Sequence, residues 1–66
     1  MKVNSSMISD ISYDKDKKIL TVVFNNGATW NYLDVPNNVW EDMKKSNSIG
    51  SFFLHKIKPN YKGEKA

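Results

Sequence analysis

Two aromatic residues separated by one position, Trp30 and Tyr32, are the clearest sign of binding chemistry in this chain. Residues two apart on a β-strand lie on the same face of the sheet. On an exposed face the two rings would form a platform on which nucleic-acid bases stack. On a face covered by helices they would belong to the core instead. A 66-residue chain needs most of its aromatic side chains inside, which favours the core for Tyr32 and leaves both alternatives open for Trp30.

A second set of candidate binding residues is basic and lies late in the chain. Residues 1–43 hold four lysines and six acidic residues (net −2), whereas residues 44–66 hold six lysines and one glutamate (net +5). This asymmetry is compatible with an anionic partner, although a solvated lysine-rich surface explains the charge equally well. Because arginine is absent, bidentate readout of guanine is excluded and any nucleic-acid binding should have low sequence specificity. The basic candidates are Lys44, Lys45, His55, Lys56, Lys58 and Lys62.

Catalytic and metal-binding residues are scarce. The chain has no cysteine and one histidine, His55, which excludes thiolate chemistry, a zinc ribbon and any two-histidine mechanism. The acidic run Asp14-Lys15-Asp16 lacks the downstream glycine and glutamate of a calcium loop. No serine is accompanied by the glycines of a nucleophile elbow. We therefore predict a non-enzymatic protein with no catalytic residue, no metal site and no cofactor.

The length of the chain predicts one domain spanning residues 1–66. A domain of this size buries only about 60% of the surface that its unfolded chain exposes, so it has no room for a deep substrate cleft. No apolar run approaches the roughly 20 residues of a membrane span, and no signal segment is visible at the start. We expect a soluble intracellular protein with no membrane partner.

Three β-prone segments make up the first half of the chain. The alternation in 7–13 places Met7, Ser9, Ile11 and Tyr13 on one face, and 19–24 is the strongest strand because β-branched and aromatic residues fill it. Asn26-Gly27 favours a hairpin turn, since both residues tolerate positive φ. In the third segment, 28–35, the side chains opposite Trp30 and Tyr32 are Thr29, Asn31, Leu33 and Val35.

Two helices are expected after Pro36, over Asn37–Lys45 and about Ile49–Lys58. Asn38 and Glu41 have the spacing of a capping box and place Glu41 and Asp42 in the first helical turn, while Ser48 can cap the second helix. We expect order over about 3–61 and a flexible tail over 62–66. The predicted fold class is α+β: a three-stranded antiparallel meander followed by two short helices packed on one face (βββαα).

Read in order, these pieces resemble the KTSC domain, a short module named for the C-terminus of some lysyl-tRNA synthetases that also occurs as a free-standing protein in bacteria and their phages. The family usually shows Tyr-x-Tyr where this chain has Trp30-Asn31-Tyr32. It commonly has Asn at position 54, which is Leu54 here, and basic residues near Ser51 and His55. The residues that carry the resemblance are Val3, Ser5-Ser6, Ile8, Ile11-Ser12-Tyr13-Asp14, Leu20, Val22, Phe24, Gly27, Trp30-Asn31-Tyr32, Val35-Pro36, Val39-Trp40, Ser48, Gly50, Phe52-Phe53, Ile57 and Tyr61.

Two functions from different classes follow. The resemblance implies RNA binding, and with the basic segment it predicts a module that binds RNA or another nucleic acid with low sequence specificity. Lysines would contact phosphates and Trp30 or Tyr32 would stack on bases. The alternative is an accessory protein that masks a host protein or sequesters a nucleotide-like ligand, with a homodimer supplying a groove. The resemblance implies the cytoplasm of a bacterium or of a phage-infected host.

Overall fold

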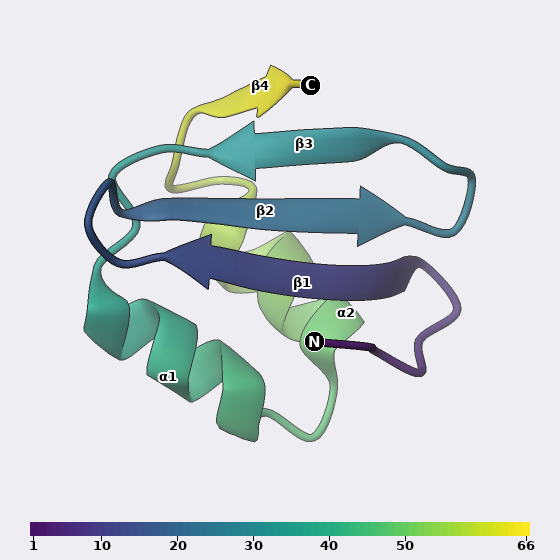
Figure 1. The fold of residues 1–66 in the computed structure, drawn as a ribbon. Helices are drawn as coiled ribbons and strands as arrows, with labels where there is room; N and C mark the ends of the chain where they lie inside the picture. Colours follow the sequence, from purple (N-terminus) through teal and green to yellow (C-terminus); the bar gives the residue numbers. More distant parts are fainter.

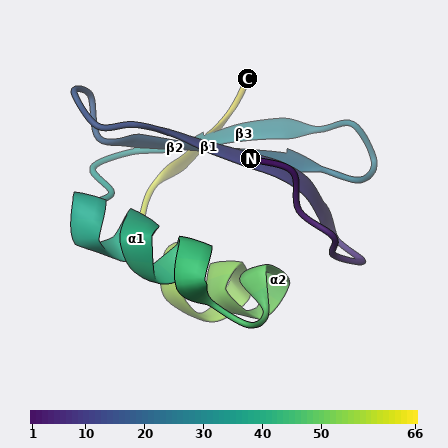
Figure 2. The same ribbon diagram turned by 60° about the horizontal axis from the view of Figure 1, so that its bottom comes forward.

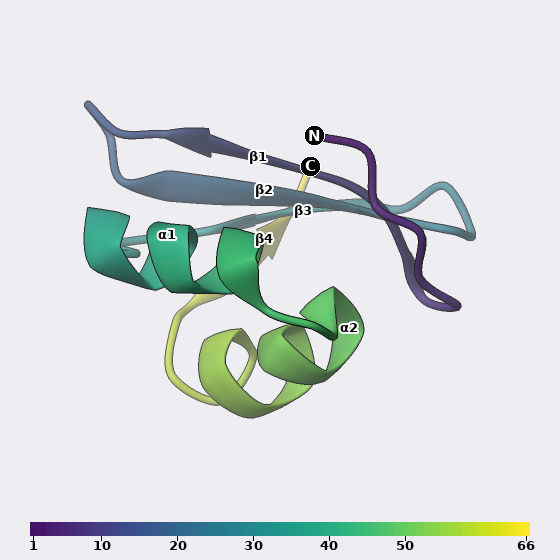
Figure 3. The ribbon, with the colours of Figure 1, turned by 90° about the horizontal axis from the view of Figure 1, so that it is seen from below.

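The structure, a computed structural model, describes residues 1–66 and consists of one antiparallel sheet with its helices on a single face (Figure 1). The strands lie in the order β1-β2-β3-β4. Figures 2 and 3 show α1 and the second helical segment on the same side of the sheet, as predicted. The elements are β1 (Ile8–Asp14), β2 (Ile19–Phe24), β3 (Thr29–Tyr32), α1 (Asn37–Lys45), α2 (Ile49–Phe52), the π-helical turn η1 (Phe53–Ile57) and β4 (Gly63–Lys65).

The fourth strand, β4, corrects the predicted strand count of three. It lies within 62–66, where the sequence predicts a flexible tail, and it pairs antiparallel with β3. Beyond the strand pairs, the Leu33 N–H donates to the Lys62 carbonyl and the Ala66 N–H donates to the Thr29 carbonyl, both at 2.9 Å. Gly, Glu and Lys have low β propensity. The strand therefore forms because the helices return the chain to the unpaired edge of β3.

A β-bulge in β1 overturns the simple alternation predicted for residues 7–13. Ile8 lies opposite Phe24 while Asp10 lies opposite Val23, so β1 holds one extra residue at this point. Such an insertion shifts the side-chain pattern by one position. As a result Ile8 and Ile11, which the alternation puts on opposite faces, are both fully buried in the core.

The turns on either side of β3 depend on two residues with positive φ. The hairpin between β2 and β3 forms as predicted, but only Gly27 has positive φ (+91°), so the turn is not the two-residue Asn-Gly type. The Gly27 N–H donates to the Phe24 carbonyl at 2.9 Å. After β3, Asp34 has φ +57°, and Val35 is fully buried instead of sharing the face of Thr29. A left-handed residue reverses the direction of the chain, which explains the change of face.

Helix α1 has the predicted bounds but not the predicted cap. Pro36 precedes it without a side-chain cap, and no acidic residue lies in the first turn. The capping box is therefore wrong, since Asn38 lies inside the helix. Glu41 instead forms an ion pair with Lys44 at 3.0 Å. Met43 is fully buried, so α1 is held mainly by packing against the sheet.

The second helical segment begins at its predicted cap and changes its winding at the centre. The Ser48 hydroxyl accepts from the Ser51 N–H at 3.3 Å. From Phe53 the helix widens into the π turn, and the Lys58 N–H donates to the Phe53 carbonyl five residues earlier. No helix of this chain has both the length and the apolar character needed to cross a membrane. The buried core is Ile8, Ile11, Leu20, Val22, Tyr32, Val35, Met43, Phe53 and Ile57.

Candidate functional site

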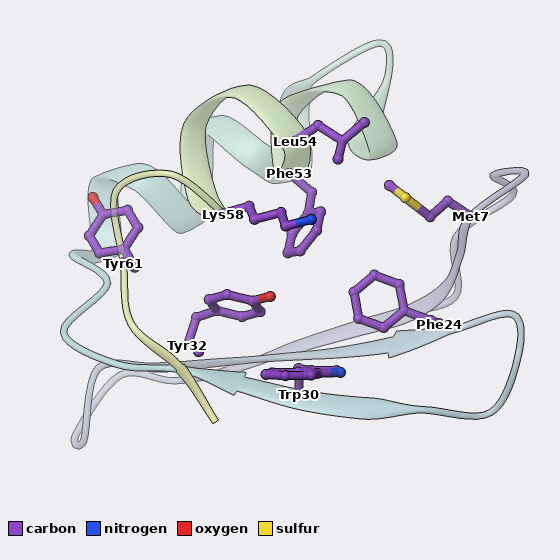
Figure 4. A pocket seen from close by; sticks show the side chains of 9 residues that line it. Met7, Phe24, Trp30, Tyr32, Phe53, Leu54, Lys58 and Tyr61 are labelled. Carbon is purple, nitrogen blue, oxygen red and sulfur yellow. The ribbon is translucent and has the colours of Figure 1, made fainter. Parts of the chain in front are cut away.

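A pocket of about 450 Å³ opens between the sheet and the second helical segment (Figure 4). We call it the aromatic pocket. Strands β2 and β3 supply one side of it, the helical segment supplies the facing side, and the chain leading into β4 closes one end. Residues distant in the sequence meet here because β4 returns to the sheet beside β3. The nine lining residues are Met7, Phe24, Trp30, Tyr32, Phe53, Leu54, Lys58, Tyr61 and Gly63.

Three rings form the closed inner part of the aromatic pocket. Phe53 meets Phe24 and Tyr32 edge to face, with centroids 5.4 and 5.3 Å apart and ring planes at 73° and 77°. These are favourable aromatic geometries. Phe53 is 2% exposed and Tyr32 is 6% exposed, so neither ring offers a free face. Of the aromatic pair, Tyr32 is a core residue, whereas Trp30 is only half-buried and lines the pocket.

The polar atoms of the aromatic pair are not used by the protein itself. Neither the Tyr32 hydroxyl nor the Trp30 indole N–H makes a hydrogen bond within the chain, and no fully buried polar side-chain atom lacks a partner. Both atoms therefore retain access to solvent, and Figure 4 shows the Tyr32 oxygen directed toward the middle of the pocket. A tyrosine hydroxyl is protonated and able to donate at neutral pH, and burial raises the pKa of Tyr32 further above its ordinary value of 10.0.

Lys58 is the one charged residue that lines the aromatic pocket. Its side chain extends from the end of the helical segment toward the rings (Figure 4). The helical spacing explains its placement, because residues four apart share a face. Leu54 and Lys58 both line the pocket, and Phe53 and Ile57 are both buried. An exposed cation thus stands beside an apolar, aromatic space.

Lys65 adds a second positive charge on the same side of the sheet. It lies directly opposite Trp30 in the register of β3 and β4. Side chains that are directly opposed on neighbouring antiparallel strands share a face. Lys65 therefore lies on the face of Trp30, near the aromatic pocket, whereas Glu64 belongs to the opposite face with its partner Asn31.

The structure divides the six basic candidates among different surroundings. Only Lys58 joins Trp30 and Tyr32 in the aromatic pocket. His55 and Lys56 line a separate hollow of about 410 Å³, which we call the polar hollow, with Ser46, Asn47, Ser48, Ser51 and Phe52. Lys44 forms its ion pair with Glu41, and its ammonium lies 5.4 Å from the centre of the Trp40 ring. Lys45 and Lys62 are exposed and line neither space.

Sequence reasoning missed most of the residues that complete the aromatic pocket. Phe24 follows the alternation of Leu20 and Val22, so the face of the sheet on which it lies was predictable. Its place in the pocket depends on the second helical segment, which faces the sheet there. Gly63 lies in the segment for which no strand was predicted. Leu54 lines the mouth and is 45% exposed. Nothing in the spacing of these residues places them beside Trp30.

Acidic and histidine side chains do not gather into a metal site. No group of three or more His, Cys, Asp or Glu residues in the chain is placed to hold a metal ion. The ion pairs that the structure contains are the Lys44–Glu41 pair and a contact between the Met1 amino group and Asp10. The aromatic pocket itself is lined by aromatic and apolar side chains and a single cation, Lys58.

Comparison with known proteins finds one family and several relatives. The sequence model of the KTSC domain matches residues 4–61. A protein of Tsukamurella paurometabola is 37% identical over 60 residues, which cover 91% of this chain and 90% of that protein. A lysine–tRNA ligase of Nostoc punctiforme is 34% identical over 64 residues, covering 97% of this chain but only 11% of the ligase.

A solved structure has the same fold. The crystal structure of a KTSC domain protein from Yersinia pestis superposes with a TM-score of 0.93 at 34% sequence identity. The match covers 100% of this chain and 93% of that one. The agreement over the whole chain includes the strand β4 that closes the aromatic pocket.

Proposed function

This chain belongs to the KTSC domain family, and from that premise we propose that it is a non-enzymatic module that binds single-stranded RNA with low sequence specificity. The observation that carries the proposal is that Lys58, on the helical side, and the half-buried ring of Trp30, on the sheet side, line the same aromatic pocket. Proteins that bind single strands combine aromatic rings for the bases with cations for the backbone. The proposed setting is the cytoplasm of a bacterium or of a phage-infected host.

The names of two relatives also support the proposal of RNA binding. Two of them are named lysine–tRNA ligases, from Nostoc punctiforme and Trichormus variabilis, and this chain corresponds to 11% of the length of each. By those names the ligases act on a tRNA. A domain carried by such an enzyme is well placed to contact RNA, which agrees with a pocket that pairs a stacking ring with a cation.

The charge distribution limits the strength and selectivity of this binding. Lys58 lines the aromatic pocket and Lys65 lies opposite Trp30 in the sheet, whereas the other candidate lysines line no part of the pocket and contact only RNA that extends beyond it. Each phosphate neutralised by a lysine releases counterions, so affinity falls as salt is raised. Lysine contacts phosphate as a point charge without the bidentate geometry that reads bases. Low sequence specificity follows.

Fluorescence of Trp30 tests the proposal directly. In a Trp40→Phe variant, Trp30 is the sole reporter, and stacking of a base should quench it when single-stranded oligouridylate or oligoadenylate is added at low salt. The matched Trp30→Phe variant keeps Trp40, which lies outside the pocket in contact with Tyr13 and Lys44, and should show no quenching. If neither RNA nor DNA alters Trp30 fluorescence or binds at low salt, the proposal is wrong.

A second candidate function, the sequestering of a free nucleotide, is favoured by the volume of the pocket. About 450 Å³ lies within the range of roughly 300–1,000 Å³ typical of small-molecule sites. The masking of a host protein has less support, because the large hydrophobic side chains that are well exposed are only Met1 and Leu54. Binding of mononucleotides in the absence of any RNA binding would favour this second candidate.

A further inference from the structure

The aromatic pocket offers a stacking surface for a single base. A flat sheet that binds RNA stacks two or three bases on several exposed rings. Here Phe53 and Tyr32 are 2% and 6% exposed, so their ring faces are covered by neighbouring side chains. Of the aromatic pair, only Trp30 keeps an accessible ring in the pocket. Phe24 and Tyr61 also line the pocket and are half-buried, so the limit to one base comes from the size of the space and not from the number of accessible rings.

The walls of the pocket also limit the ligand to one unit. The helical segment faces the sheet through Leu54 and Lys58, and Tyr61 and Gly63 close one end. A volume of about 450 Å³ is near the lower end of the range for small-molecule sites, which is roughly 300–1,000 Å³. A paired base cannot enter such a space, since it would have to leave its helix. The pocket suits an unpaired nucleotide.

The pocket offers groups that suit the base and the phosphate of a nucleotide. The Trp30 ring can stack on the base, and the Lys58 ammonium can contact the phosphate. The Tyr32 hydroxyl has no partner in the protein and is directed into the pocket (Figure 4). A hydroxyl both donates and accepts, so it can bond to a base edge once the base is seated.

We infer that the aromatic pocket binds one unpaired nucleotide, with its base on Trp30, a base edge hydrogen-bonded to the Tyr32 hydroxyl and its phosphate at Lys58. This inference rests on the proposed function and names the unit that the site recognises. Two consequences distinguish it from binding along a surface. Free ribonucleoside monophosphates occupy the same site as RNA, and Tyr32 sets the order of preference among the four bases.

Competition between mononucleotides and RNA tests the first consequence. Each of the four ribonucleoside monophosphates is titrated against a fluorescent oligouridylate bound to the wild-type chain. We expect at least one of them to displace the RNA completely. We also expect the affinity of the chain for oligouridylates to stay nearly constant as they are lengthened beyond one nucleotide, apart from the non-specific electrostatic contribution of the added phosphates.

A Tyr32→Phe variant tests the second consequence, because it keeps the ring that packs on Phe53 and removes only the hydroxyl. We expect the preferred monophosphate to bind about five- to tenfold more weakly, the usual effect of losing one hydrogen bond. The spread among the four nucleotides should shrink as well, which a purely structural role would not cause. The matched control is Tyr13→Phe, whose hydroxyl bonds to the Val35 carbonyl outside the pocket and whose loss should leave the ranking unchanged.

The possible failures are distinguishable. If RNA binds but no mononucleotide displaces it, and affinity rises with each added nucleotide, the single-nucleotide inference is overturned while RNA binding stands. If mononucleotides bind and Tyr32→Phe leaves their ranking unaltered, the assignment to Tyr32 is overturned. If neither RNA nor mononucleotides bind, both the inference and the proposed function fail.

Discussion

Gly63 lies so close to the Tyr32 ring that a Cβ on residue 63 would come within 2.6 Å of Cε1 and 2.9 Å of Cζ. The two residues are directly opposed in the register of β3 and β4. The missing side chain is therefore what allows β4 to pair beside Tyr32 while the ring stays packed on Phe53. One glycine joins the last strand, the core and the aromatic pocket.

A Gly63→Ala substitution should consequently destabilise the protein. We expect the free energy of unfolding to fall by about 1–3 kcal/mol, since the added methyl group must displace the ring or the strand. Urea denaturation followed by circular dichroism measures this change. The neighbouring Glu64→Ala is the matched control, because Glu64 is exposed and should alter stability by no more than about 0.5 kcal/mol. Equal stability of both variants would contradict the close packing of Gly63 and Tyr32.

Replacing Lys58 by Gln should weaken RNA binding without affecting the fold, because the side chain is exposed. Losing one phosphate contact on a single strand should reduce the slope of log affinity against log salt by about 0.7. Fluorescence anisotropy at several salt concentrations gives this slope. Lys17→Gln makes the same charge change in the turn between β1 and β2, which lines no part of the pocket, and should leave the slope nearly unaltered.

A Lys56→Gln variant tests whether RNA binds at the aromatic pocket or on a broad basic surface. Lys56 lies two residues from Lys58 but lines the polar hollow instead of the aromatic pocket. We expect the loss of affinity for short oligonucleotides to be clearly smaller for Lys56→Gln than for Lys58→Gln. The same anisotropy assay compares them at equal salt. Equal losses would indicate that the six basic candidates act as one surface and that the pocket has no special part in binding.

Stability should fall at alkaline pH because of two tyrosines. Burial raises the pKa of Tyr32 above its ordinary value of 10.0. Burial and, to a lesser extent, the neighbouring Asp14 carboxylate raise the pKa of Tyr13. In the folded state each group holds its proton more tightly, so the stabilisation is complete below pH 10 and is lost as the pH rises through the folded-state pKa.

Lysines also lose their charge in this pH range. The contribution of Tyr32 is therefore measured as the difference in stability between the wild type and a Tyr32→Phe variant. The free energy of unfolding of the wild type minus that of Tyr32→Phe should be constant below pH 10 and decrease above it, because the variant has no hydroxyl to ionise. Urea denaturation across the alkaline range provides the comparison. A constant difference at all pH values would contradict a raised pKa for Tyr32.

The turn between β1 and β2 is a site where stability can be gained. Lys18 is exposed and has φ +57°, a conformation that costs a residue with a side chain about 1 kcal/mol. Lys18→Gly should raise the free energy of unfolding by up to about 1 kcal/mol, reduced by the greater freedom of glycine in the unfolded chain. Thermal unfolding measures the gain. Lys17→Gly is the control, because Lys17 has no positive φ and should gain nothing from the change.

Local sequence signals predicted the main elements well. The β-branched run of β2, the bounds of α1 and the Ser48 cap follow from propensity and capping, which act over a few residues. The same signals failed where a distant contact decides the conformation. The bulge in β1 is required by pairing with β2, and the left-handed Asp34 is required by burial of Val35 beneath the helices.

The candidate site was predictable only in part, for the same reason. Trp30, Tyr32 and Lys58 were identifiable as residue types suited to stacking and to anions, and the ordered aromatic and apolar pattern was enough to indicate the family. Their association in one pocket was not predictable. Helical spacing separates Lys58 from Lys56, since residues two apart on a helix do not share a face, but only the packing of the helical segment decided which of them faces the sheet.

By itself, therefore, the sequence determined the class of fold and the family, and it indicated candidate binding residues. Only the tertiary structure decided that Gly63–Lys65 forms a strand, that Tyr32 is buried and that Trp30 and Lys58 share one pocket. The physical reason is the range of the interactions. Propensity and capping act between near neighbours in the chain, whereas pairing at the edge of β3 and packing around the Tyr32 ring join residues 21 to 35 positions apart.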